Sequence, residues 1–179
     1  MKNDYLIVMA DIVASGGLDQ ALTMQQFQQL VEAVNAKLGE ALISPLTITL
    51  GDEFQGIIRE IAGLPQLVFA LEEQALSLGT GFKLRYIFYE GKIDTPINHE
   101  VAYGMMGAGL TQARAELMTG KRTARRFSVV LKDAEKSAAL SDALLVFQGI
   151  VDSWRPEPDH RLVFAFLGTT DYKQVAENL

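Results

Sequence analysis

The sequence predicts an α+β domain in which helices pack on a sheet, and two patterns near the amino terminus support this class. Residues 5–10 form a continuous apolar run, as is typical of a strand covered on both faces. Residues 23–42 then repeat apolar side chains at steps of three and four, which predicts a helix of about five turns. Thr23 and Gln26 have the spacing of a capping box at its start.

The following segment reads as a hairpin. Residues 46–50 alternate apolar with β-branched polar side chains after Pro45, which we expect to end the preceding helix. Gly51 and Asp52 form a tight connection into a second strand over residues 54–58.

A helix over 64–75, with Pro65 in its first turn, and an alternating strand over 83–89 come next. This order is the ferredoxin-like (βαββαβ) arrangement, in which antiparallel strands are covered by helices on one face. The first strand then lies beside the strand 54–58. Beyond this core the patterns predict three more elements: a helix over 108–118, a strand over 127–131 and a helix over 137–154.

Two prolines in the segment 154–158 predict a boundary, because each restricts the residue before it. We therefore expect a domain over 1–155 and a helical tail over 156–179. The tail combines a short apolar helix over 161–167 with a terminal segment that is similar to the first helix of a helix-turn-helix. Either the chain is truncated before a recognition helix, and DNA is a partner, or the tail is only a terminal helix.

Composition limits the function classes. The net charge of −6 disfavours nucleic acid as a partner of the whole chain, and no apolar run approaches the roughly 20 residues of a membrane span. The absence of cysteine excludes disulfides and thiolate metal sites, and no signal-peptide pattern opens the chain. We expect a cytoplasmic protein. The basic stretch 114–126 is either a solvated helix end or a phosphate-contacting surface.

Two carboxylates are the strongest site candidates. Asp11 ends the first apolar run and Asp52 lies in the hairpin turn, so the predicted topology makes them neighbours at one edge of the sheet. Hard cations such as Mg²⁺ or Mn²⁺ prefer oxygen ligands and leave positions open for phosphates. The alternative is that each is an ordinary turn residue. Glu53 should face away from Asp52, because neighbouring strand residues point to opposite faces. Ser15 and Gly16 open either a phosphate-binding loop or a plain one.

Three segments carry a family resemblance: 11–15 (Asp-Ile-Val-Ala-Ser), 47–56 (Thr-Ile-Thr-Leu-Gly-Asp-Glu-Phe-Gln-Gly) and 107–114 (Gly-Ala-Gly-Leu-Thr-Gln-Ala-Arg). In these segments the chain resembles the SatD family, whose members look like a nucleotide-cyclase-type palm domain, often followed by a winged-helix segment. The first two segments are also similar to class III nucleotide cyclases and to the Gly-Gly-Asp-Glu-Phe signature of diguanylate cyclases.

The resemblance implies a metal site made of Asp11, Asp52 and the backbone carbonyl of Ile12. In the cyclases the two carboxylates hold metals that activate a 3′-hydroxyl and neutralise the triphosphate. Arg114 would be a cation directed at phosphate.

The sequence also departs from the cyclase pattern. Ile48 stands near the place of the base-selecting lysine and Leu110 at that of the transition-state asparagine, and apolar side chains form no hydrogen bonds. Ile87 stands where the pattern has glycine. The residues that the resemblance implies for metal binding are present, whereas those that it implies for base recognition are not.

Three functions remain open from the sequence. The first is a regulatory, catalytically degenerate SatD-like protein that binds a divalent metal, a nucleotide or both, coupled to DNA through its tail. The second is an active nucleotidyl or phosphoryl transferase of altered specificity, which the lost residues disfavour. The third is a non-catalytic scaffold that forms a homodimer.

Overall fold

The computed structural model describes residues 4–178, apart from the side chains of Ser15 and Asn178. In chain order its elements are β1 (Asp4–Ile12), the 3-10 turn η1 (Ser15–Gly17), α1 (Gln20–Leu38), the 3-10 turn η2 (Gly39–Ala41), β2 (Leu42–Leu50), β3 (Glu53–Ile58), α2 (Gly63–Leu78), β4 (Leu84–Lys92), α3 (Ala108–Gly120), β5 (Phe127–Val130), α4 (Ala134–Val151), α5 (Asp159–Thr169) and α6 (Tyr172–Asn178).

The sheet confirms the predicted βαββαβ core. Its strand order is β2-β3-β1-β4-β5, with β1 in the centre between β3 and β4. The pairs β2–β3, β1–β3 and β1–β4 are antiparallel, and β5 adds to the edge of β4 in parallel. The predicted extra strand therefore extends the core sheet on the side opposite the hairpin.

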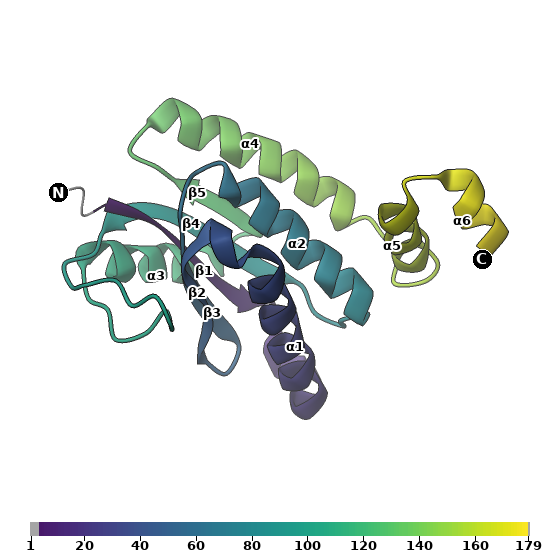
Figure 1. Cartoon of the computed structure of the whole chain (residues 1–179), viewed down its shortest axis with the longest axis horizontal. Coiled ribbons are helices and arrows are strands. Elements are labelled where there is room, and N and C mark those ends of the chain that lie inside the picture. The colour runs from purple at the N-terminus through teal and green to yellow at the C-terminus, as the bar shows by residue number, and fades with distance from the viewer. Residues whose placement is uncertain (1–3, 179) are drawn as a thin grey trace.

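Helices cover both faces of this sheet, so the expectation of one covered face is wrong for the whole domain (Figure 1). The helices α1, α2 and α4 pack on the larger core, which includes Val8 and Ala10 of β1. The helix α3 packs on the other face, over a smaller core that includes Ile7 and Met9. Because side chains alternate along a strand, the next residue on the α3 face of β1 is Asp11.

Two glycines set the distance between α3 and the sheet. A Cβ atom at Gly109 in the first turn of α3 would lie 2.6 Å from the carbonyl carbon of Gly91 in β4. A real side chain cannot adopt such a contact, so only glycine allows the helix backbone to approach this strand. The close approach fixes where the later residues of α3 meet the sheet.

The structure corrects two helix boundaries. The helix α1 begins at Gln20 rather than at Thr23, because the side chain of Asp19 accepts a hydrogen bond from the Leu22 N–H and caps it. The helix ends at Leu38, and Pro45 lies inside the edge strand β2, where the pairing register shifts. An edge strand with a bulge tolerates the missing N–H of proline.

The strand β4 also differs from its sequence pattern, since its first five residues are all buried. Alternation predicted one buried face, but α3 covers the second face.

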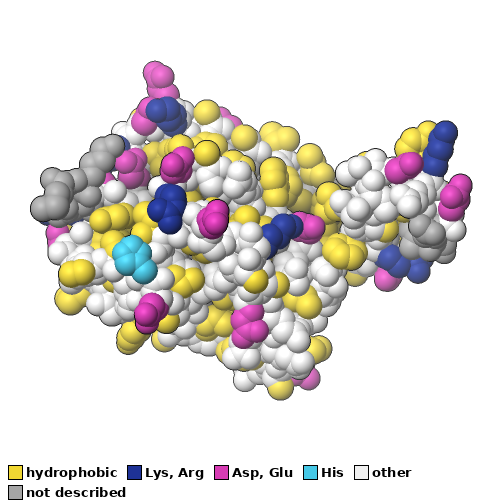
Figure 2. Space-filling view, viewed as in Figure 1, with side chains coloured by type: hydrophobic (Ala, Val, Ile, Leu, Met, Phe, Trp, Pro, Cys, Tyr) yellow, Lys and Arg dark blue, Asp and Glu magenta, His cyan; other side chains and the backbone are white. Residues whose placement is uncertain are grey.

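The tail begins beyond α4. The helices α5 and α6 project at one end of the molecule, where α5 contacts α2 (Figure 1). Exposed apolar side chains lie over α2 and α4, among them Phe69, Val146 and Ile150 (Figure 2). Within residues 4–178, no helix is long and apolar enough to span a membrane. The boundary near residue 155 stays a prediction.

Candidate functional site

Three charged residues form a row across the centre of the sheet. In the antiparallel register Asp11 of β1 lies opposite Glu53 of β3 on one side and opposite Arg85 of β4 on the other. Register partners point to the same face of a sheet, so all three side chains belong to the α3 face. All three residues are buried. We call this row, together with the cations described next, the Asp11 corner.

The helix α3 and its end bring two more cations to the row. Lys121, which caps the carboxyl end of α3, places Nζ 3.0 Å from Oδ2 of Asp11 and 3.9 Å from Oε1 of Glu53. Arg114 donates from Nη2 to Oε2 of Glu53 at 2.8 Å, and Arg85 donates from Nη1 to Oδ2 of Asp11 at 3.3 Å. Each carboxylate of the row therefore has two cationic neighbours.

One oxygen of this corner is left without a partner. Among the described residues, Oδ1 of Asp11 is buried and accepts no hydrogen bond. Desolvation raises the pKa of Asp11 above its ordinary value, the nearby Asp52 raises it further, and Lys121 and Arg85 lower it only in part. A buried carboxylate oxygen without a donor is costly, and a bound cation would compensate it.

The structure brings Asp11, Ile12 and Asp52 together, as the topology predicts. The backbone N–H of Ile12 donates to the carbonyl oxygen of Asp52 at 3.0 Å, which holds the hairpin turn against the end of β1. Asp52 is half-buried, and its charge contributes to the raised pKa of Asp11.

A cavity of about 250 Å³ opens beside this turn. It is lined by Ile12, Gly16 and Asp52, together with Gln20, Thr23, Met24 and Gly51. Gly16 thus lies next to the predicted metal ligands, while the side chain of Ser15 lies outside the described residues. Arg114 is not in this cavity, because it contacts Glu53 on the α3 face.

Asp11, Asp52 and the Ile12 carbonyl offer oxygen donors of the type that Mg²⁺ or Mn²⁺ prefers. Within the described residues, no group of three or more His, Cys, Asp or Glu side chains is arranged to hold a metal. Asp11, Asp52 and the Ile12 carbonyl would supply part of the shell. Mg²⁺ commonly binds through one or two carboxylates with the remaining positions filled by water and phosphate oxygens.

The sequence argument gave Arg85 no role in the site, named Lys121 only within the basic stretch 114–126, and left Glu53 outside the site. Glu53 and Arg85 lie at the starts of the two strands beside β1, so antiparallel pairing places both near Asp11 at the end of β1. Lys121 has no such signal, since its position depends on how α3 packs.

The positions that differ from the cyclase pattern are packing positions. Ile48 packs against the larger core and Leu110 against the smaller one. Neither side chain offers a hydrogen bond to a ligand.

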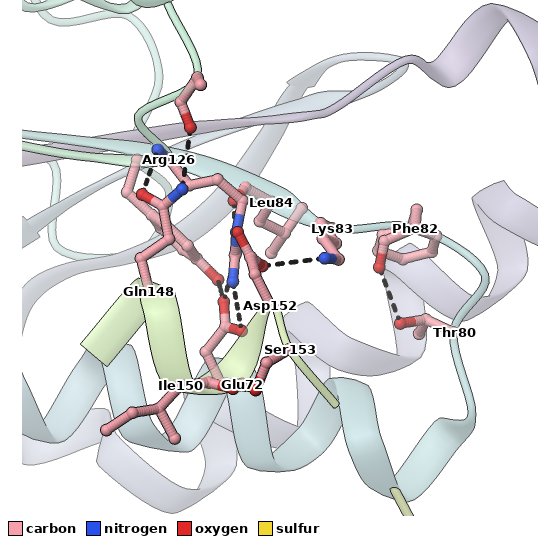
Figure 3. Close-up of polar contacts among 12 residues, drawn as sticks. Glu72, Thr80, Phe82, Lys83, Leu84, Arg126, Gln148, Ile150, Asp152 and Ser153 are labelled. Carbon is pink, nitrogen blue, oxygen red and sulfur yellow. Dashed lines mark hydrogen bonds and ion pairs between the residues drawn. The ribbon is translucent and has the colours of Figure 1, made fainter. Parts of the chain in front are cut away.

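A second polar cluster, centred on Arg126, has a structural role. Arg126 donates from Nε to Asp152 at 3.0 Å and from Nη1 and Nη2 to Glu72 at 2.9 and 3.0 Å (Figure 3). Its backbone N–H donates to the side chain of Gln148, and the hydroxyl of Tyr86 also donates to Glu72. The cluster joins α2, β4, β5 and α4, and nearly every donor of its buried guanidinium has an acceptor.

The sheet and its helices define an α+β domain with a βαββαβ core. A sequence profile of the SatD family matches residues 5–173, and the chain belongs to the SatD family.

Nucleotide cyclases are among the solved structures with a similar chain path. A bacterial light-regulated adenylyl cyclase is 8% identical with a TM-score of 0.49, and the match covers 70% of this chain but only 42% of the cyclase. A dimeric guanylyl cyclase domain of the RhoGC fusion protein from the aquatic fungus Blastocladiella emersonii is 14% identical with a TM-score of 0.47, covering 65% and 74% of the two chains. The monomeric form of that fungal domain gives 11% identity and a TM-score of 0.40, with coverage of 65% and 75%. No curated protein matches the chain.

Proposed function

We propose that this SatD-family protein binds a nucleoside triphosphate together with Mg²⁺ or Mn²⁺ at the Asp11 corner, in a regulatory role without turnover. The observation that carries the proposal is the buried Oδ1 of Asp11, which has no donor among the described residues. The hairpin turn that holds Asp52 is bonded to the next residue, Ile12. A divalent cation bound by the Asp11 and Asp52 carboxylates and by the Ile12 carbonyl would be coordinated by Oδ1 of Asp11.

The charges of the corner favour a metal–phosphate complex over either component alone. Among the described residues, the corner holds the carboxylates of Asp11 and Glu53, with that of Asp52 in the adjoining turn. The cations beside them are Arg85, Arg114 and Lys121. A bare cation would be repelled by the basic side chains, and a bare triphosphate by the acidic ones. A metal–triphosphate complex carries positive and negative charge, so it can contact the acidic and the basic side chains together. Metal and nucleotide should therefore bind cooperatively.

The regulatory role follows from what the site lacks. Catalysis of phosphoryl-type transfer needs groups that stabilise the transition state beyond the metal. At two positions where the resemblance implies such polar groups, Ile48 and Leu110 pack against the cores instead. The output would run through α5 and α6, with DNA as the proposed downstream partner. A gel shift of labelled genomic fragments that depends on the tail tests that partner.

Calorimetric titration tests the proposal. We expect Mn²⁺ and ATP or GTP added together to bind the wild-type protein, and Asp52→Ala to abolish that binding. Asp142→Ala is the matched control, because it removes an exposed carboxylate from α4, far from the hairpin in sequence and fold. Absence of heat with every nucleotide would refute the proposal. Metal-dependent turnover of a triphosphate, lost in Asp11→Asn, would instead establish the alternative, an active transferase.

A further inference from the structure

A second cavity lies on the α3 face and shares Arg85 with the Asp11 corner. Its volume is about 180 Å³, and its wall is built from the end of α3, the following loop, β4, β5 and Ser141 of α4. The polar lining consists of two arginines, one carboxylate and four hydroxyls: Arg85, Arg125, Glu116, Thr119, Thr123, Ser128 and Ser141. We call it the Arg85 cavity.

Arg85 has hydrogen-bonding capacity that the fold does not use. Its residue is 9% exposed, yet among the described residues its guanidinium makes a single hydrogen bond, from Nη1 to Asp11 at 3.3 Å. Arg126 is 5% exposed, and its Nε, Nη1 and Nη2 atoms all donate to acceptors at 3.0 Å or less. A guanidinium has five N–H donors in a planar fork that matches carboxylate and phosphate oxygens. The donors of Arg85 without a described acceptor belong to a side chain that lines the cavity.

Ser128 adds a hydroxyl to the same face. It is the register partner of Ile87, which packs in the core under α3, so its side chain lies on the α3 face of β5. Among the described residues its hydroxyl has no hydrogen-bond partner. The Thr123 hydroxyl already donates to the Gly120 carbonyl, and Arg125 is exposed at the same loop.

We propose that the Arg85 cavity binds the phosphate group of a small phosphate compound, at a second site that borders the metal corner and shares Arg85 with it. Arginines outnumber carboxylates in its lining although the chain as a whole carries a net charge of −6. Charge-assisted bonds from a planar guanidinium are the strongest contacts that proteins make with phosphate. The volume is below the range of roughly 300–1,000 Å³ that accommodates drug-sized ligands, so it suits a phosphate with at most a small substituent rather than a nucleotide base.

Titration with inorganic phosphate and with methyl phosphate, in chelator and without nucleotide, tests this site alone. We expect saturable binding that Arg85→Gln weakens about tenfold or more, the loss typical of a charge-assisted contact. Ser128→Ala should weaken it less while leaving the fold intact. Glu116→Gln should strengthen binding by about threefold, because it removes the one acidic side chain among the described lining residues and its repulsion of the anion. A gain of affinity cannot come from misfolding.

Two controls separate this site from others. Arg122→Gln removes an exposed cation from the same loop that does not line the cavity, and it should leave phosphate affinity unchanged. Asp52→Ala should also leave it unchanged, even if it abolishes metal–nucleotide binding, so the two proposals fail independently. Phosphate affinity that is insensitive to Arg85→Gln and Glu116→Gln, or that is lost in Asp52→Ala, would overturn the inference. A preference for inorganic phosphate over methyl phosphate would identify the free anion as the ligand, and the reverse would identify an ester.

Discussion

Asp11 and Glu53 are register partners on adjacent strands, and Lys121 lies between them, with Nζ 3.0 Å from one carboxylate and 3.9 Å from the other. Two buried acids thus share one cation from the end of α3. The lysine partly balances the charge that a divalent metal would otherwise neutralise. Metal binding and the position of Lys121 should therefore depend on each other.

Lys121→Gln should make the corner a better site for a bare divalent cation. Removing the shared lysine leaves the carboxylates with less compensating charge, so Mn²⁺ alone should bind more tightly, by about tenfold if one partly screened charge contact is lost. Calorimetry of Mn²⁺ without nucleotide measures the change. Arg122→Gln, one residue further along, provides the control. Unchanged Mn²⁺ affinity in Lys121→Gln would mean that the metal does not bind near Asp11.

Adjacent carboxylates in the hairpin should have opposite roles. Asp52→Asn should abolish metal–nucleotide binding with little effect on stability. Glu53→Gln should retain binding but lower the free energy of unfolding by about 1 kcal/mol, because it weakens the contact with Arg114, whose side chain is 48% exposed and therefore screened. Urea denaturation and calorimetry on both variants check the pair. If Glu53→Gln abolished metal–nucleotide binding and Asp52→Asn retained it, Glu53 would be the metal ligand.

The stability of the protein should depend on pH through Asp11. Desolvation raises the pKa of Asp11 in the folded state above its ordinary value of 3.8, so the folded protein binds this proton more tightly than the unfolded chain does. Between the two pKa values the contribution of Asp11 to the free energy of unfolding falls as pH rises, and it is constant outside that window.

Denaturation of the wild type and of Asp11→Asn across a pH series isolates this contribution. The difference between their unfolding free energies should shift in favour of the wild type as pH falls toward 3.8. A difference that is flat with pH would contradict the raised pKa.

Arg126→Met should destabilise the fold without affecting the corner. The change leaves Glu72 and Asp152 without their buried cation, and breaking one partner of a buried pair costs about 3–5 kcal/mol. Arg122→Met, at an exposed position, should stay within roughly 0.5 kcal/mol of the wild type. Chemical denaturation measures both. A small effect at Arg126 would show that the cluster in Figure 3 does not hold α4 to the sheet.

Local sequence patterns predicted most of the core elements. The apolar run of β1, the helical period of α1 and the hairpin around Gly51 and Asp52 depend on neighbouring residues, and each is present. Pro45 misled the boundary of α1, because a proline that breaks a helix is equally compatible with a bulged edge strand. Asp19 was overlooked as the cap for a similar reason, since Thr23 offers the same chemistry.

The parts of the site that depend on tertiary packing could not be predicted. The proximity of Asp11 and Asp52 follows from the strand topology. Lys121, by contrast, reaches Asp11 because Gly91 and Gly109 let α3 approach β4 closely. The burial of Oδ1 of Asp11 likewise depends on a helix that covers the second face of the sheet. The sequence pattern predicts this helix over residues 108–118, but it does not indicate which face of the sheet the helix covers.

The most direct test is a crystal structure of the protein with Mn²⁺ and a non-hydrolysable ATP analogue, using the anomalous signal of manganese. Our account predicts an anomalous peak at coordination distance from Oδ1 of Asp11 and from the Asp52 carboxylate, with phosphate oxygens completing the shell. Nucleotide bound elsewhere, or a corner in which Lys121 and Arg85 still hold Asp11 and no manganese is present at saturating concentration, would contradict it.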